Sequence, residues 1–288
     1  MKIHWAGFKH YGSVEVRSYP SGEPLVGFMT ECAGIERVLL RPTSMLDLMG
    51  GLFFVDALME RGHPAPELIL PFVPGARQDR LNDAGDFLFT AKSVAREIIL
   101  RGFPKVTVVD PHSEVIVGLI DRCHVMHAHE CIDTEAVRMS AYDAVISPDA
   151  GAEKRAGAVA KKLGLPLLHG WKARNIATGA ITGFGLEPTS FVKKADGHRF
   201  RMLVVDDICD GGGTFIGLAG VLRERDIIGD LYVTHGIFSQ GTPKLLEHYQ
   251  DVFCTDSLDW APPVCRNGVR IIPVCKRLIE VGFLPLVG

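Results

Sequence analysis

The residues with the clearest chemistry lie in the stretch RMLVVDDICDGGGTF, which begins at Arg201. Its apolar run predicts a buried strand, so Asp206 and Asp207 should stand at a strand's carboxyl end, where open α/β sheets bind ligands. Glycines at 211–213 let consecutive backbone N–H groups turn toward one point, and a helix predicted to begin near Thr214 adds its positive end. These features predict a phosphate-binding loop. Two carboxylates beside it suit the vicinal hydroxyls of a ribose or a divalent cation, which indicates a sugar phosphate rather than a dinucleotide.

Other segments place this motif in a wider pattern. VVDDICDGGGT is similar to the phosphoribosyl-diphosphate binding motif of type I phosphoribosyltransferases and of ribose-phosphate diphosphokinases. PFVPGARQDR and FTAKSVA resemble the diphosphokinase region that holds ATP phosphates, which simple transferases lack. Four more segments follow in the diphosphokinase order: VTVVDPHSEVIVG, VISPDAGAEKRAGAVAKKLG, WKARN and VTHGIFSQGTPKLL. The resemblance runs from about residue 19 to about residue 275 and implies a diphosphokinase.

The resemblance assigns ATP phosphates to the segment RQDR. Arg77 and Gln78 become ATP contacts, and Asp79 would orient them by hydrogen bonding. The planar guanidinium of arginine matches phosphate oxygens, although a solvated basic loop would have the same composition. The following LNDAGD departs from the family, which is basic there, so the phosphate or regulatory contacts of those residues are not expected here.

The resemblance assigns adenine to YPSGE, the counterpart of the family's FxDGE loop. Tyr19 would stack on the base, and Glu23 would accept a hydrogen bond from its exocyclic amine. Ser21 stands where the family is acidic, which predicts altered or looser adenine recognition. In the family this loop reaches a nucleotide held by a neighbouring subunit, which implies a homo-oligomer, either a dimer or a hexamer. Relatives carry a further strand and helix before this loop, and we expect that difference to affect assembly.

Metal handling and catalysis are also assigned by resemblance. His112, which the family pattern also links to ATP, and Asp149 each follow an apolar strand and would handle Mg²⁺, which prefers oxygen ligands together with water and phosphate. Lys172 and Arg174 stand where the family has a mobile catalytic loop. Diphosphoryl transfer needs positioning and cations over the transferring group, which a closing basic loop provides. No general base is evident.

The resemblance assigns the ribose phosphate to the C-terminal half of the chain. The residues expected to bind it are Asp206, Asp207, Asp210, Gly211, Gly212, Gly213 and Thr214. The implied reaction moves the β,γ-diphosphoryl group of MgATP to the C1 hydroxyl of ribose 5-phosphate and releases AMP. The family carries a threonine after its third aspartate, so Gly211 raises the alternative of a substituted acceptor such as ADP-ribose. Further alternatives are a phosphoribosyltransferase and a non-catalytic regulatory subunit of a diphosphokinase.

Composition agrees with a cytoplasmic enzyme. The 288 residues are 47% hydrophobic and 23% charged with a net charge of −3, so we expect no binding to nucleic acid or to anionic membranes. No apolar stretch approaches the roughly 20 residues of a membrane span. The seven cysteines include no CxxC pair, which favours reduced thiols.

Strand and helix patterns alternate along the chain, which predicts an α/β fold. The predicted strands are 67–71, 105–109, 144–147, 202–205 and 230–235, and the predicted helices are 47–61, 91–101, 154–163 and 214–225. With the resemblance, we expect two phosphoribosyltransferase-like domains, each a mostly parallel sheet flanked by helices. An N-terminal ATP-side domain would span 1–139 and a ribose-phosphate domain 140–276, with a boundary near 134–142. The tail 277–288 would pack on the first domain.

Overall fold

The computed structural model describes residues 1–7, 10–27, 34–81, 88–132, 142–174, 181–187, 198–259 and 268–280. Most of the loop after RQDR, of the expected domain boundary, of the loop after WKARN and of the tail lies outside these residues. The chain divides into two compact units. The first comprises Met1–Met126, Asp256–Trp260 and Pro273–Gly288, and the second comprises His127–Thr255 and Ala261–Ile272.

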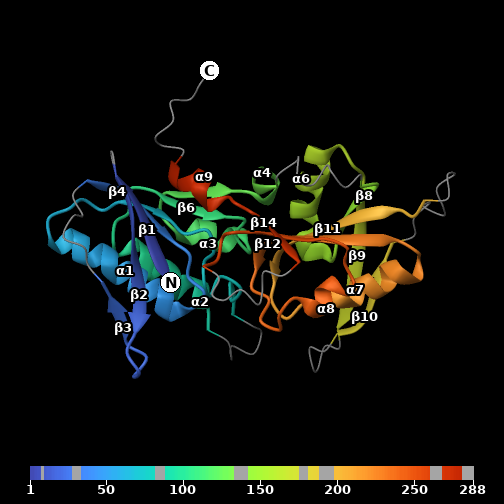
Figure 1. Ribbon diagram of the computed structural model, residues 1–288, viewed down its shortest axis with the longest axis horizontal. Helices are drawn as coiled ribbons and strands as arrows, with labels where there is room; N and C mark the ends of the chain where they lie inside the picture. Colours follow the sequence, from blue (N-terminus) through green and yellow to red (C-terminus); the bar gives the residue numbers. More distant parts are fainter. Residues whose placement is uncertain are drawn as a thin grey trace, which may run out of the picture. The chain divides into compact units, whose positions relative to one another are not determined.

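The first unit is built on a seven-stranded sheet in the order β3-β2-β1-β4-β5-β6-β7 (Figure 1). Its strands are β1 (Lys2–Gly7), β2 (His10–Ser18), β3 (Pro24–Val26), β4 (Ile35–Leu40), β5 (Glu67–Ile69), β6 (Val106–Val109) and β7 (Cys123–Met126). Strands β4 to β7 are parallel, whereas β1, β2 and β3 form an antiparallel edge. The helices are α1 (Met45–Glu60), α2 (Thr90–Ile99), α3 (Glu114–Leu119) and α9 (Cys275–Glu280). Strand β6 is buried along its whole length, as in sheets covered on both faces.

The second unit is also built on a seven-stranded sheet, in the order β10-β9-β8-β11-β12-β13-β14. Its strands are β8 (Ala144–Ser147), β9 (Leu167–Arg174), β10 (Ile181–Leu186), β11 (Arg201–Cys209), β12 (Ile228–Gly236), β13 (Val252–Thr255) and β14 (Val269–Ile272). Only β10 pairs antiparallel among them. The helical segments are α4 (Ala128–Cys131), η1 (Ala150–Ala152), α6 (Glu153–Leu163), α7 (Gly213–Glu224) and α8 (Pro243–Leu246). Helix α6 lies on one side of β11 and α7 on the other (Figure 1).

The antiparallel edges of both sheets contain a cross-strand pair of tryptophan and glycine. Trp5 of β1 pairs with Gly12 of β2, and Trp171 of β9 pairs with Gly185 of β10. In each pair the indole lies flat over the glycine, because a Cβ added at Gly12 or Gly185 would stand 2.3 Å or 2.2 Å from the ring. A larger residue would push the ring away from its strand.

The predicted fold class, an α/β protein with mostly parallel sheets flanked by helices, is confirmed. Every strand and helix predicted from the sequence is present, and the limits agree within two residues except at one strand end. Strand β11 was expected to end at Val205 but continues to Cys209. It does so because its pairing with β12 continues, with Ile208 opposite His235 and Cys209 opposite Gly236.

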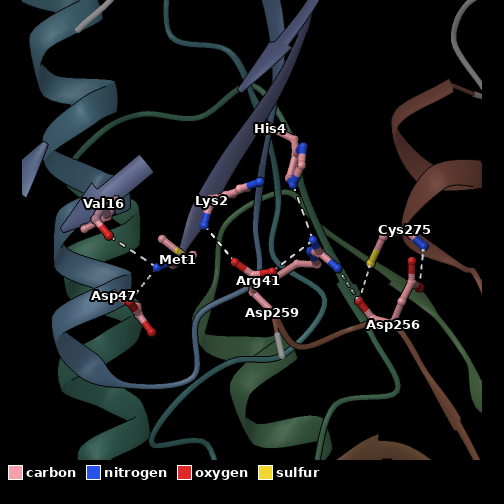
Figure 2. A network of polar contacts seen from close by, with 9 residues as sticks. All are labelled: Met1, Lys2, His4, Val16, Arg41, Asp47, Asp256, Asp259 and Cys275. Carbon is pink, nitrogen blue, oxygen red and sulfur yellow. Dashed lines mark hydrogen bonds and ion pairs between the residues drawn. The ribbon is translucent and has the colours of Figure 1, made fainter. Parts of the chain in front are cut away.

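A short segment after β13 joins the first unit through polar contacts (Figure 2). Arg41, directly after β4, donates to the Asp256 carbonyl oxygen at 3.3 Å and to the Asp259 carboxylate at 3.2 Å. The Asp256 carboxylate accepts from the backbone N–H groups of Val274 at 2.7 Å and Cys275 at 2.9 Å, where α9 begins. Helix α9 in turn contacts β1 and β4. The first unit is therefore held together by residues far apart in the sequence.

None of the described helices combines the length and the apolar character that crossing a lipid bilayer requires.

Candidate active site

The first element of the site is the acid pair, Asp206 and Asp207, on β11. Strand β8 pairs with β11 only as far as Val204, so the acid pair lies beyond the end of β8, while β12 still flanks it. The carboxylate of Asp206 accepts from the Asp207 N–H at 2.8 Å, and that of Asp207 accepts from the Ile208 N–H at 2.8 Å. The backbone thereby fixes one oxygen of each carboxylate at the carboxyl edge of the sheet.

Arg155, in the first turn of α6, faces the acid pair. Its Nη1 lies 3.7 Å from Asp206 Oδ1, and its Nη2 lies 3.7 Å from Asp207 Oδ2. Burial and the neighbouring Asp207 raise the pKa of Asp206 well above its usual range, and the Arg155 guanidinium opposes that rise. The sequence analysis did not single out Arg155. The one signal for it was an arginine near the start of the predicted helix that follows Asp149.

The phosphate loop, Asp210–Thr214, joins β11 to α7 as predicted. Helix α7 begins at Gly213, and Gly212 before it has a φ of +79°, a left-handed conformation that favours glycine. The loop after β12 contacts it through the backbone. The N–H groups of Phe238 and Ser239 donate to the carbonyl oxygens of Cys209 at 2.9 Å and Asp210 at 3.1 Å. The loop therefore presents the positive end of a twelve-residue helix on a fixed backbone.

Gly211, the departure from the family pattern, does not need to be glycine for backbone reasons. Its φ is outside the left-handed region. A Cβ added there would meet only Gln240 Cγ, at 3.8 Å, which is ordinary van der Waals contact. A small side chain therefore fits at this position without displacing a neighbour.

Lys172 and Asp149 form an ion pair in the second unit. Asp149 follows β8, and its carboxylate also accepts from the N–H groups of Gly151 at 2.8 Å and Ala152 at 3.2 Å. These bonds fix the turn that leads into α6. Lys172 lies on β9, next to β8, so its ammonium reaches the same edge of the sheet as the acid pair. Arg174 ends β9, and its side chain is outside the described part of the structure.

The residues expected to bind ATP phosphates lie in the first unit. Gln78 is anchored at the start of α2, where its backbone carbonyl accepts from the Ala91 N–H at 3.1 Å and its side chain accepts from the Thr90 hydroxyl. Asp79 is buried and accepts from Arg80 Nε at 3.0 Å. Burial alone would raise the pKa of Asp79, but the Ser113 hydroxyl and the Arg80 guanidinium lower it.

Two exposed residues complete this phosphate side of the first unit. Arg77 lies on the loop that contains Asp79, and His112 lies beside Ser113 in the loop after β6. The charge of His112 also contributes to lowering the pKa of Asp79. The loops after β5 and β6 are thus brought together.

The segment YPSGE forms the turn between β2 and β3. Tyr19 is 50% exposed, and its N–H donates to the Glu23 carbonyl oxygen at 2.9 Å. The Ser21 hydroxyl donates to the Glu23 carboxylate at 2.9 Å. The serine that replaces the family's acidic residue thus contacts the carboxylate expected to recognise adenine.

The side chains of the described residues could serve as ligands for a magnesium ion that is also bound by substrate phosphates. No cluster of three or more His, Cys, Asp or Glu side chains among them is arranged as a complete protein metal site. Mg²⁺ is usually held by one or two carboxylates plus substrate phosphates and water, so a single carboxylate such as that of Asp149 is sufficient. His112 belongs to the first unit and Asp149 to the second.

Comparison with known proteins supports the resemblance. No protein-family model matches the chain. Ribose-phosphate pyrophosphokinase from Ralstonia nicotianae is 30% identical over 285 residues, covering 96% of this chain and 85% of the relative. The pyrophosphokinase from Corynebacterium efficiens is 30% identical over 278 residues, covering 91% and 81%. Among solved structures, phosphoribosylpyrophosphate synthetase from Mycobacterium smegmatis has a TM-score of 0.76 at 26% identity, covering 93% of this chain and 88% of that one.

Proposed function

Because the chain belongs to the ribose-phosphate pyrophosphokinase (diphosphokinase) family, a family of transferases, we propose that it makes phosphoribosyl diphosphate from MgATP and ribose 5-phosphate. The C1 hydroxyl attacks the β-phosphorus of ATP, the bond from the β-phosphorus to the α-phosphate oxygen breaks, AMP leaves, and the hydroxyl proton passes to solvent. The observation that carries this proposal is the assembly of the acid pair, the phosphate loop and Lys172 at the carboxyl edge of one parallel sheet.

The acceptor site follows from that assembly. The N–H groups at the start of α7 bind the 5-phosphate, and Asp206 and Asp207 bind the ribose hydroxyls. Lys172 and Arg174 neutralise the charge that develops on the transferring group. Asp149 of the second unit and His112 of the first are the residues that would handle Mg²⁺, which would supply further charge neutralisation on the phosphate oxygens.

The nucleotide side uses the first unit. Arg77 and Gln78 bind ATP phosphates, with Asp79 positioning them, while Tyr19 and Glu23 take the adenine. Glu23 already accepts from Ser21 through Oε2, and its other oxygen can accept from the adenine amine. The exposed position of Tyr19 suits contact with a nucleotide on a neighbouring copy, so we propose a homo-oligomer, either a dimer or a hexamer. Size-exclusion chromatography with light scattering tests this point, and a monomer under assay conditions would contradict it.

A second candidate is the same chemistry on a substituted ribose phosphate such as ADP-ribose. The lack of a side chain at Gly211 favours it, since a group attached to the 5-phosphate could occupy the place that a threonine would fill. One experiment separates the candidates: incubation with MgATP and either ribose 5-phosphate or ADP-ribose, followed by mass analysis. The acceptor that gains two phosphoryl units while AMP appears is the substrate. No turnover of either acceptor would contradict both candidates.

A further inference from the structure

Arg155 is a charged side chain at the site to which the proposed reaction gives no role. Arg155 is 11% exposed, and its guanidinium lies 3.7 Å from a carboxylate oxygen of Asp206 and 3.7 Å from one of Asp207. A single planar cation therefore spans both carboxylates. Arginine offers donors at a fixed separation, which a lysine ammonium does not.

The acid pair needs such a cation for geometric reasons. Consecutive residues of a strand direct their side chains to opposite faces, and two nearby carboxylates repel each other. The backbone N–H groups of Asp207 and Ile208 fix only one oxygen of each carboxylate. Arg155 lies 3.7 Å from an oxygen of each carboxylate, so its charge offsets their repulsion. It thereby favours the arrangement in which two adjacent ribose hydroxyls can contact both.

The position of Arg155 is itself set by the fold. Asp149 caps the turn before α6 through the N–H groups of Gly151 and Ala152, which fixes where the first turn of the helix lies. Helix α6 packs on β11 and β8, so this first turn is held beside the strand that carries the acid pair. A rigid helix start therefore supports the guanidinium.

We propose that Arg155 is a positioning residue for the acceptor, holding the carboxylates of Asp206 and Asp207 side by side so that they bind the vicinal hydroxyls of a ribose phosphate. The inference rests on the proposed function, because it concerns the acceptor site. It makes a specific demand: Arg155 should affect acceptor affinity and leave ATP affinity alone.

The test compares Arg155→Met, Arg155→Lys and the control Lys161→Met, which removes an exposed cation from the same helix. Calorimetry measures the Kd of each variant for ribose 5-phosphate, for ADP-ribose and, separately, for MgATP. For whichever acceptor the unaltered protein binds, Arg155→Met should raise the Kd about tenfold or more, as expected for losing a charge-assisted contact. The Kd for MgATP should stay within about twofold, and Lys161→Met should change neither. Arg155→Lys should recover part of the acceptor affinity, because lysine keeps the positive charge but lacks the paired donors of the planar guanidinium.

Two results would overturn the inference alone: unchanged acceptor affinity in Arg155→Met, or an equal loss of acceptor and MgATP affinity. If Arg155→Met does not fold, the same comparison in Arg155→Lys decides, because its charge is retained. If the unaltered protein binds neither ribose phosphate, the proposed function fails, and the role of Arg155 fails with it.

Discussion

At the scale of single residues, two cations of the candidate site in the second unit already form ion pairs with its carboxylates. Lys172 is paired with Asp149, and Arg155 with the acid pair, Asp206 and Asp207. In the proposed reaction, a cation bound at Asp149 would weaken the ion pair with Lys172, and the Lys172 ammonium could then move to the diphosphoryl group. Substrate binding and the placement of Lys172 would be coupled in this way.

The first prediction concerns Lys172 and Arg174, the two cations that we propose act in catalysis. Lys172→Ala and Arg174→Ala should each lower kcat by about 10²-fold or more, because their charges are needed chiefly in the transition state. The KM for the acceptor should change far less. Steady-state kinetics with Lys161→Ala as an exposed control measures this, and near-normal turnover in either variant would remove that residue from the catalytic step.

The second prediction separates two neighbouring glycines. Gly212→Ala should destabilise the protein by about 1 kcal/mol or more, because its φ of +79° is left-handed and Leu245 lies 3.3 Å from the new Cβ. Gly211→Thr should leave the melting temperature nearly unchanged, because neither obstacle exists there.

The Gly211→Thr variant also tests which acceptor the protein uses. If glycine admits a substituted phosphate, Gly211→Thr should lose activity on ADP-ribose and keep activity on ribose 5-phosphate. The activation free energies for the two acceptors should then differ by about a few kcal/mol at most. Equal losses on both acceptors would show that the side chain at this position does not select the acceptor.

Much of the phosphate loop could be predicted because its signals are local. Asp206, Gly212 and Thr214 lie within a few residues of one another, and their order alone specifies a strand, a turn and a helix start. Arg155 could not be found in this way, because its contact with β11 depends on how α6 packs, some fifty positions earlier in the chain. Ser21 was noted as a departure from the family, but its hydrogen bond to Glu23 required the turn geometry.

At the scale of elements, the β9–β10 hairpin rests directly on helix α7. Phe184 of β10 lies against Gly217 of α7, where an added Cβ would stand 2.0 Å from the ring. Phe184 is the cross-strand partner of Lys172, so the two side chains share a face of the hairpin. The C-terminal end of the helix is also tied to β10, because Arg225 donates to the carbonyl oxygens of Leu186 at 2.8 Å and Glu187 at 3.1 Å. Lys172, for which we propose a catalytic role, and the phosphate loop are therefore linked through one helix.

The third prediction tests this link with two glycines of the same helix. Gly217→Ala should displace Phe184, shift Lys172 and lower kcat about tenfold or more, since small misplacements of catalytic groups are costly. Gly220→Ala should leave kcat unchanged and stabilise the helix by up to about 1 kcal/mol, because nothing lies within 4 Å of its added Cβ. Equal kcat values for the two variants would contradict the link.

The end of β11 shows why element limits are harder to predict than elements. The apolar run of β11 stops at Val205, so the sequence pattern placed the strand end there. Hydrogen bonding to β12 does not depend on side-chain polarity, and the strand continues to Cys209. The acids therefore project from a paired strand, which holds them more rigidly than a loop would.

At the scale of the whole molecule, the stability of the second unit depends on a buried charge network opposite the carboxyl edge of its sheet. Arg201, at the start of β11, donates to Asp230 at 2.6 Å and to Asp251 at 2.9 Å, and the Tyr142 hydroxyl donates to Asp230 at 2.6 Å. Asp230 is fully buried. Burial raises the pKa of Asp230, although Tyr142 and Arg201 oppose the rise.

The fourth prediction compares a buried and an exposed arginine that share Asp251. Arg201→Met should destabilise the protein by about 3–5 kcal/mol, because it leaves a buried carboxylate without its counter-ion. Arg270→Met should cost less than about 1 kcal/mol, because that side chain is 53% exposed. Urea denaturation measures both.

The pH dependence of the fourth prediction follows from the raised pKa of Asp230. A carboxyl with a raised pKa in the folded state binds protons more tightly there. The loss in the free energy of unfolding caused by Arg201→Met should therefore be largest at neutral pH and become smaller as the pH falls toward that pKa. A deficit that does not vary with pH would show that lost packing, and not the unpaired charge, causes it.

The composition of the first unit has a consequence for protein synthesis. A ribosome releases the chain from its N-terminus, so residues 1–126 emerge long before the segments Asp256–Trp260 and Pro273–Gly288 that complete the same unit. Until then Arg41 lacks its contacts with Asp256 and Asp259, and β1 and β4 lack helix α9. The second unit is almost contiguous and can form from His127–Thr255 in a single passage. The unit that is translated first is thus the last to be finished, and β1 and β4 stay without the cover of α9 while the rest of the chain is made.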